Sequence, residues 1–256
     1  MAKAVKLETL VSRLNRSLDI ESFSDSSHNG LQVASRSGQV TKVCAGVDAT
    51  LPFFKAAVEQ GADLAIVHHG ISWGDSLKHI TGLNFEIVSF LLEHNLALWA
   101  CHLPLDAHLK FGNNAQIAST LGLRKIKPFG AYHGQKIGVQ GELASALSFK
   151  EMHDLIGKKI NLELQAFNLG SERIKKIGIV SGGGSDALPE AIEAKLDLFL
   201  TGEPVLWAYN LALQEGINLA FAGHYATEVF GVKALLPLVR QWYRLPVNFI
   251  DTKIPL

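Results

Sequence analysis

Short apolar runs that alternate with helical segments constrain the fold of this chain more than any other feature of its sequence. In the first half, such runs occupy residues 42–49, 63–70 and 96–102, and helix-patterned stretches at 51–62 and about 83–94 separate them. Runs that are apolar at nearly every position are typical of parallel strands buried on both faces, with helices as crossover connections. The pattern therefore predicts an α/β fold with a mostly parallel or mixed sheet flanked by helices.

The second half of the chain repeats this order of elements. Three strand-like runs alternate with helical patterns again, at residues 175–184, 197–203 and 217–228. In each half the third run leads into a His with an acid four residues later, which gives the pairs His102/Asp106 and His224/Glu228. We therefore predict an internal duplication that produces two similar α/β domains.

The length of 256 residues also suits two domains of ordinary size. We expect them to span residues 1–128 and 129–256, with a boundary near Pro128–Gly130. Residues 135–168 have a strand–helix–strand pattern and are interpreted as an addition to the second domain. The helix after Glu228 could pack on the first domain.

Composition and charge indicate a globular protein and argue against several classes of partner. Hydrophobic residues make up 48% and charged residues 19% of the chain, as in ordinary folded domains. The 24 basic and 24 acidic residues cancel without a long Lys/Arg block, which argues against nucleic acid or an anionic membrane as partner. No apolar run approaches the ~20 residues that span a bilayer.

The N-terminal segment lacks the pattern of a signal peptide, and the two cysteines are also consistent with a protein of the cytoplasm. Cys44 and Cys101 each lie inside an apolar stretch. Two buried, reduced thiols are the favoured interpretation over a disulfide or a zinc knuckle. We therefore expect a cytoplasmic protein.

Histidines and acids stand where the predicted strands end. His68-His69-Gly70 closes one apolar run, and ligands of open parallel sheets gather beyond the carboxyl ends of the strands. Gly70 permits the turn that both imidazoles need to reach one site. A polar turn with two hydrogen-bonded histidines is the alternative for this segment taken alone.

The His102/Asp106 and His224/Glu228 pairs extend this pattern to two more strand ends. Asp106 and Glu228 taken alone could be helix caps or turn residues. Because three separate structural explanations would have to hold together, the recurrence favours metal binding. A carboxylate has two oxygens, so Glu228 could bridge two ions.

Mixed nitrogen and oxygen ligands suit Zn, Fe, Mn, Co or Ni, so the sequence predicts two divalent metal ions without identifying them. Two such ions ~3.5–4 Å apart activate water and polarise the group that it attacks. The catalytic group is left open between this water and Glu228.

Two further segments could line the same cleft. The segment Ser181-Gly-Gly-Gly-Ser185-Asp186 lies between a strand and a helix, so its amides could cradle phosphate. It matches neither GxxxxGK[ST] nor GxGxxG, and a flexible turn is the favoured interpretation. Thr201-Gly202-Glu203 is the counterpart of the histidine pair in the second series, with a cap at Thr201 as the alternative. No GxSxG motif supports a Ser nucleophile.

Six segments in order resemble the NGG-interacting-factor-three-like family, whose bacterial members are known as GTP cyclohydrolase I type 2 homologues. The segments are HNGLQV, GVDAT, IVHHGISWG, CHLPLDAH, TGE and GHYATE. The match runs in order from Asn29 to Glu228 and so spans most of the chain. The resemblance implies two similar α/β domains with a dinuclear metal site between them, assembled as toroidal hexamers. This chain has the short form, without room for the large insertion of longer members.

The resemblance also implies a role for each ligand. His68 and His69 would bind different ions, with Asp106 joining His69 and His224 joining His68. Glu228 would bridge both ions. His102 would be a sixth ligand or a neighbour that orients one. The chain shows no departure from the family pattern at the five ligand positions.

The predicted ligands and the resemblance together favour a metal-dependent hydrolase acting on a C–N bond of a purine nucleotide, as a GTP cyclohydrolase does. A non-catalytic metal-binding scaffold or metal-delivery protein is the alternative from another class, because no phosphate loop or general base is recognisable. A two-metal phosphoesterase or peptidase is a third hypothesis.

Overall fold

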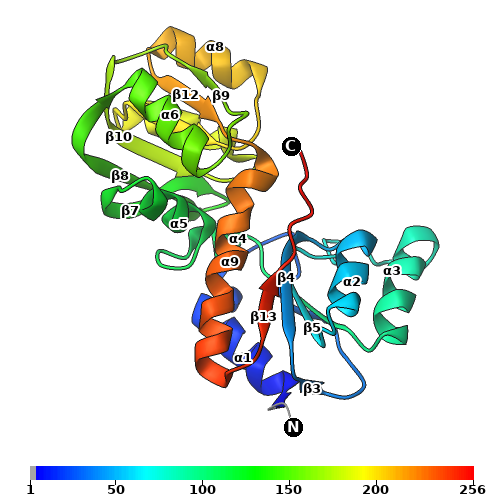
Figure 1. Cartoon of the computed structure of the whole chain (residues 1–256). Coiled ribbons are helices and arrows are strands. Elements are labelled where there is room, and N and C mark those ends of the chain that lie inside the picture. Colours follow the sequence, from blue (N-terminus) through cyan, green and yellow to red (C-terminus); the bar gives the residue numbers. More distant parts are fainter. Residues whose placement is uncertain (1–3) are drawn as a thin grey trace. The chain divides into compact units, whose positions relative to one another are not determined.

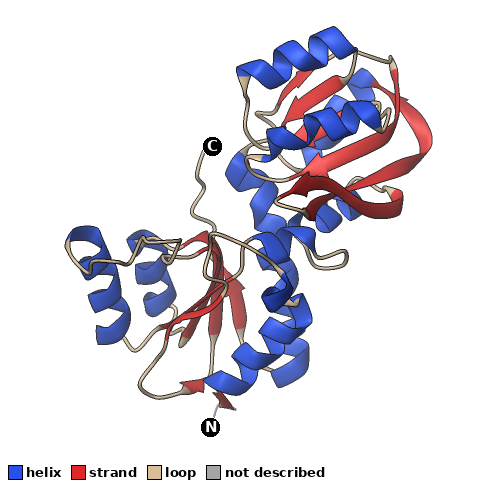
Figure 2. Cartoon of the chain, turned by 180° about the vertical axis from the view of Figure 1, so that it is seen from behind, coloured by secondary structure: helices blue, strands red, loops and turns tan. Residues whose placement is uncertain are grey.

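A computed structural model describes residues 4–256, and these fold into two compact units (Figures 1 and 2). Unit 1 comprises the residues up to Leu105 together with Val232–Thr252, and unit 2 comprises Asp106–Gly231 with Lys253–Leu256. The division therefore differs from the predicted boundary at residues 128/129, which falls inside strand β7 (Arg124–Tyr132). Pro128 resembles a turn residue in sequence, but β7 is an edge strand, where proline is tolerated.

Unit 1 is built on a five-stranded sheet in the order β13-β4-β5-β6-β2. Its strands are β2 (Gly30–Val33), β4 (Val43–Asp48), β5 (Leu64–His69), β6 (Ala97–Ala100) and β13 (Val247–Phe249). The pairs β13-β4, β4-β5 and β5-β6 are parallel, and β2 is antiparallel to β6. The three apolar runs predicted in the first half are β4, β5 and β6, and their buried residues point to both faces of the sheet.

Helices cover both faces of this sheet. The helices α2 (Leu51–Glu59) and α3 (Gly82–Glu93) pack Phe53 and Leu91 against one face. The helix α1 (Leu7–Leu18) and the later part of α9 cover the other (Figure 1). Short elements complete the unit: β1 (Val5–Lys6), which pairs with β3 (Gln39–Val40), the 3-10 helix η1 (Ile20–Ser22), and α4 (Leu103–Ala107), which leads into unit 2.

Unit 2 is built on a six-stranded sheet in the order β7-β8-β10-β11-β12-β9. The strands after β7 are β8 (Gln135–Ser148), β9 (Gln165–Phe167), β10 (Arg173–Val180), β11 (Leu198–Thr201) and β12 (Asn218–Phe221). The strands β10, β11 and β12 are parallel, and the other pairs are antiparallel. In both units, three consecutive parallel strands have an antiparallel strand beside the third, which fits the predicted duplication without proving it.

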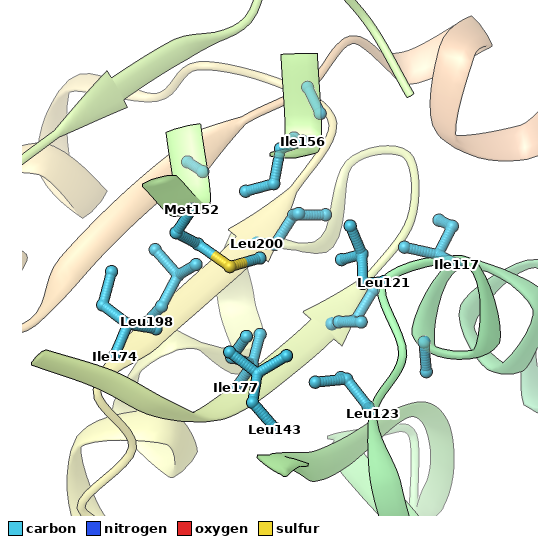
Figure 3. Close-up of a cluster of buried hydrophobic side chains, with 14 of the residues drawn as sticks. Ile117, Leu121, Leu123, Leu143, Met152, Ile156, Ile174, Ile177, Leu198 and Leu200 are labelled. Carbon is cyan, nitrogen blue, oxygen red and sulfur yellow. The ribbon is translucent and has the colours of Figure 1, made fainter. Parts of the chain in front are cut away.

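Helices also flank the sheet of unit 2. The helices α5 (Asn113–Thr120) and α6 (Phe149–Lys159) lie on one face, and the η2 segment (Gly184–Ala187), α7 (Leu188–Glu193) and α8 (Leu206–Glu215) lie on the other. Figure 3 shows the hydrophobic core on the face covered by α5 and α6. Met152 and Ile156 of α6 belong to this cluster together with Ile177 and Leu198 of the sheet. The predicted fold class, mixed α/β sheets flanked by helices, is confirmed.

The last long helix, α9 (His224–Tyr243), begins in unit 2, and its residues from Val232 onward belong to unit 1. Within unit 1, the Arg13 guanidinium of α1 lies 4.4 Å from the ring centroid of Trp242 in α9. Between residues 4 and 256, none of the helices combines the length and apolarity that crossing a bilayer requires.

Candidate functional site

Three imidazoles gather at the carboxyl end of the parallel strands in unit 1. The strand β5 ends with His68 and His69, and His102 follows β6. One nitrogen from each of the three rings lies within 4.8 Å of the other two. The ring centroids are 4.6 Å apart for His68 and His69 and 5.1 Å apart for His68 and His102. The three rings are therefore close enough to supply imidazole ligands to divalent cations at this end of the sheet.

Each of these imidazoles has an oxygen acceptor at Nδ1. The Nδ1 of His68 is 2.8 Å from the carbonyl oxygen of Cys101, and that of His69 is 2.8 Å from Asp48 Oδ1. The Nδ1 of His102 is 3.0 Å from Asp25 Oδ1. An acceptor at this position holds the proton on Nδ1 and directs the Nε2 lone pair to a ligand, which is the usual arrangement around metal-binding histidines.

Asp25 is one of two functional residues of unit 1 that the sequence did not predict. Its side chain is 2% exposed, and it accepts hydrogen bonds from the His102 ring, the Leu103 amide and the Asn29 amide group. Burial is the largest influence and would raise the pKa of Asp25, but the His102 contact, Asn29 and the Ser27 amide together lower it from 3.8 to about 2. Asp25 is therefore an ionised acceptor.

Asp48 was likewise missed as a partner of His69. It ends β4, and β4 and β5 are parallel neighbours in which Asp48 pairs directly with His69. In the sequence, Asp48 is part of a predicted strand and of the segment GVDAT of the family resemblance, but neither assigns it a role at the site. The sequence did contain an indication of this role. Asp48 is a carboxylate at the end of a buried strand, and the ends of parallel strands lie at the same edge of the sheet as the histidines.

In unit 2, His224 and Glu228 occupy the first turns of α9, four residues apart on one face of the helix. The Nδ1 of His224 is 2.6 Å from Glu203 Oε1, and its Nε2 is 3.0 Å from Glu228 Oε1. When His224 Nδ1 carries its proton toward Glu203, the Nε2 atom and the Glu228 oxygen are two ligand atoms that lie close together. A nitrogen and a carboxylate oxygen in this arrangement suit a divalent metal ion.

The glycine-rich loop supports this ligand pair. A Cβ on Gly182 would overlap Glu228 Oε1 and lie 3.0 Å from His224 Nε2. The loop amides are already committed: Ser181 N donates to Asn114 Oδ1 (2.7 Å), Gly182 N to Thr227 Oγ1 (2.9 Å) and Gly184 N to Thr201 Oγ1 (3.1 Å). These three amides are therefore not available as a phosphate cradle.

Asp106 is buried in unit 2 beside the same loop. Its Oδ1 accepts hydrogen bonds from Asn113 Nδ2 (2.8 Å) and Ser181 Oγ (3.0 Å). Asn113 in turn accepts the Gly231 amide of α9 at 2.6 Å through its Oδ1. Asp106 is 6% exposed and is held by two side chains, which is more than the helix cap or turn residue considered as the alternative would require.

The predicted site residues thus fall into two groups, one in each unit. Unit 1 holds His68, His69 and His102. Unit 2 holds His224 with Glu228 and Glu203, and Asp106 with Ser181. The remaining two candidates differ in role: buried Thr201 Oγ1 donates to Gly182 O and accepts from Gly184 N, whereas Asp186 is exposed.

A cleft of about 440 Å³ in unit 2 is lined in part by His224. Asn161, Glu163, Glu203 and Phe221 are among its lining residues. This volume lies within the range of small-molecule sites. The cleft combines an aromatic surface with carboxylate and amide groups that can accept or donate hydrogen bonds.

Comparison with known proteins connects these groups to a family. The family model described as Duf34/NIF3 (NGG1p interacting factor 3) matches residues 5–255. A protein of Archaeoglobus fulgidus named GTP cyclohydrolase 1 type 2 homolog is 42% identical over 247 residues, which cover 96% of this chain and 98% of the relative. A protein of Deinococcus radiodurans with the same name is 41% identical over 244 residues, covering 95% of this chain and 92% of the relative.

Among solved structures, TTHA1606 from Thermus thermophilus has the same fold, with a TM-score of 0.90 and 35% sequence identity. The match covers 98% of this chain and 100% of that chain. The sequence and structure comparisons therefore agree over nearly the whole length of the chain.

Proposed function

The chain belongs to the DUF34/NIF3 family, and from this premise we propose that it is a hydrolase that binds two divalent metal ions. Its proposed substrate is a purine nucleotide in which a C–N bond is cleaved. Relatives at 42% and 41% identity carry the name GTP cyclohydrolase 1 type 2 homolog, and that name supports the substrate class.

One observation carries the metal part of the proposal: each candidate imidazole has an oxygen acceptor at Nδ1. The acceptors are the Cys101 carbonyl and the carboxylates of Asp48, Asp25 and Glu203. If these four histidines were only polar residues of the core, either ring nitrogen could have the oxygen acceptor, but in all four the acceptor is at Nδ1. A shared orientation of this kind is what a metal requires, because it presents Nε2 as the ligand atom.

The proposed ligands are His68, His69, Asp106, His224 and Glu228. Following the family resemblance, His68 and His69 are assigned to different ions, with His224 and Asp106 as their respective companions and Glu228 on both. When bound, the ions supply Lewis acidity, which activates water and polarises the substrate.

The chain's own residues have three tasks in this proposal. Asp25, Asp48 and Glu203 hold the imidazole protons on Nδ1. The glycine-rich loop keeps the space beside Glu228 free of side chains. Glu228, whose side chain is 4% exposed, is also the candidate to accept a proton during the reaction.

A metal and activity assay tests the proposal. Purified protein is loaded with Zn²⁺ or Mn²⁺, its metal content is measured by mass spectrometry, and its turnover of GTP and related nucleotides is compared with that of Glu228→Gln. The exposed Glu59 in α2 provides the matched control, Glu59→Gln. We expect two ions per chain and turnover in the wild type and the control. Nucleotide turnover no higher than that of Glu228→Gln would reject the hydrolase.

A non-catalytic metal-binding scaffold is the second candidate, and the commitment of the Ser181, Gly182 and Gly184 amides to protein acceptors favours it. A scaffold would keep its metal content and its partners without turnover of nucleotides, phosphoesters or peptides. The same substrate panel therefore separates it from the hydrolase and from a phosphoesterase or peptidase.

We also propose that the chain forms a homo-oligomer, a hexamer by family resemblance. Exposed apolar side chains support association, since Leu83 and Phe85 of α3 are 63% and 58% exposed and Leu206 of α8 is 76% exposed. Apolar surface of this kind often marks contacts between subunits. Light scattering coupled to gel filtration measures the mass, and a monomer at micromolar concentration would reject the assembly.

A further inference from the structure

Trp73 lies beside the imidazole group of unit 1. Its ring centroid is 4.8 Å from that of His102 and 5.9 Å from that of His69. The indole N–H donates to the carbonyl oxygen of Gly70 at 2.7 Å, which fixes the orientation of the ring. The side chain is only half-buried. A large flat ring is therefore held next to two candidate metal-binding histidines with part of its surface open.

The loop that carries Trp73 is anchored through Gln32 of β2. The Oε1 of Gln32 accepts the amides of Ile71 at 2.8 Å and Ser72 at 3.1 Å. A Cβ on Gly70 would overlap the Gln32 side chain, so this side chain fills the space under the start of the loop. These contacts fix the backbone at Ile71 and Ser72, which directly precede Trp73.

The same loop is tied to the segment that orients His102. Trp73 forms a β-bridge with Ser27, and Gly74 N donates to Ser26 O at 2.8 Å. Asp25, the acceptor for His102 Nδ1, directly precedes that segment. The indole and the His102 imidazole thus share one support, and their separation is set by the fold rather than by a mobile loop.

We propose that Trp73 is the surface on which a planar, conjugated ring of the substrate stacks, so that it selects ligands that carry such a ring over ligands that lack one. This inference rests on the proposed function and names the substrate class of that site. Because its N–H is committed to Gly70, Trp73 acts through its π-face and not as a hydrogen-bond donor. Stacking of this kind is tolerant of the particular base, so Trp73 sets the class of ring and other residues set its identity.

The test compares a ligand that carries a purine base with one that has the same sugar and phosphate but no base. Zn²⁺-loaded protein is titrated calorimetrically with guanosine 5′-monophosphate and with ribose 5-phosphate. The variants are Trp73→Ala, Trp73→Phe and Trp73→Leu, and the control is Trp242→Ala, which removes another half-buried Trp of unit 1. Loss of base stacking should weaken guanosine 5′-monophosphate binding about 5- to 150-fold in Trp73→Ala. Ribose 5-phosphate binding and the control should be unchanged.

The two conservative variants keep the test informative if Trp73→Ala does not fold. Trp73→Phe keeps a π-face and should retain most of the affinity, whereas Trp73→Leu keeps apolar volume and should lose it. Equal affinities of the Phe and Leu variants, or a wild type that binds ribose 5-phosphate as tightly as guanosine 5′-monophosphate, would overturn the proposal.

Failure of the proposed function gives a different result. Metal content is measured on every variant, and turnover is measured separately from binding. A wild type without turnover, but with ring binding that depends on Trp73, rejects the hydrolase and keeps the stacking role. Normal metal content and turnover in Trp73→Ala, with unchanged guanosine 5′-monophosphate affinity, rejects the stacking role and keeps the hydrolase.

Discussion

Replacement of Gly182 by Ala tests whether metal binding by His224 and Glu228 requires a residue without a side chain at this position. A Cβ there would lie 3.2 Å from Glu228 Cδ and 3.0 Å from His224 Nε2, and it would overlap Glu228 Oε1. Ordinary carbon contacts are ~3.5–4.0 Å, so the carboxylate must move by roughly half an ångström or more. Metal sites hold their ligands to within about 0.2 Å of the preferred distance.

Two effects are expected from Gly182→Ala, and they differ in kind. Gly182 has φ of +62°, where Ala is disfavoured by about 1–2 kcal/mol. For a chain of this size, each kcal/mol lowers Tm by roughly 2–4 °C. Displacement of Glu228 adds a specific loss of metal affinity, for which about 10- to 100-fold is the usual consequence of disturbing a residue that supports a metal ligand.

Gly122 provides the matched control. It has φ of +77° in the same unit, but a Cβ there meets nothing within 4 Å. Gly122→Ala should therefore lower Tm to a similar extent and leave metal affinity unchanged. Thermal melts measure the first effect, and competition with a metallochromic chelator for Zn²⁺ measures the second. Wild-type metal affinity in Gly182→Ala, with the two variants equally destabilised, would refute the steric reasoning.

Three further perturbations follow from the same contacts. Asp48→Asn should lower metal affinity about 10- to 100-fold, because it removes the carboxylate acceptor of His69 Nδ1. Chelator competition against the exposed Glu59→Gln control measures the affinity, and equal affinities would contradict the assigned role. Thr201→Val should cost about 1–3 kcal/mol in urea unfolding, because the buried Gly184 N–H and Gly182 carbonyl lose their hydroxyl partner; an unchanged unfolding midpoint would count against it. Removal of metal with EDTA should lower the free energy of unfolding by about 2.7 kcal/mol per site relative to protein at a free ion concentration of 100 Kd, and identical calorimetric melts with and without metal would argue that no ion is bound.

The sequence predicted the sheet cores well because their signal is local. The runs that became β4, β5 and β6 are apolar at consecutive positions, and a strand buried on both faces needs nothing else to be recognised. The domain boundary depends on pairing that local sequence does not encode. Pro128 and Gly130 have turn chemistry, yet β7 pairs with β8 through them as an edge strand.

The candidate ligands could also be predicted from the sequence, whereas most of the residues that orient them could not. His68, His69, His102 and His224 all follow or end apolar runs. Asp25 lies 77 residues before His102 in a polar segment without periodicity, so only the fold brings the two together.

Each unit supplies both its histidines and the oxygens that orient them. In unit 1 the acceptors of His68 and His69 are the Cys101 carbonyl, just after β6, and Asp48 at the end of β4, and these two strands flank β5 on either side. In unit 2 Glu203, two residues after β11, orients His224. A variant at Asp48 therefore disturbs one group of ligands, and a variant at Glu203 disturbs the second. Metal titrations of Asp48→Asn, Glu203→Gln and the double variant can therefore ask whether the two groups act on the same ions: losses of binding free energy that add indicate independent ions, and losses that fail to add indicate shared ones.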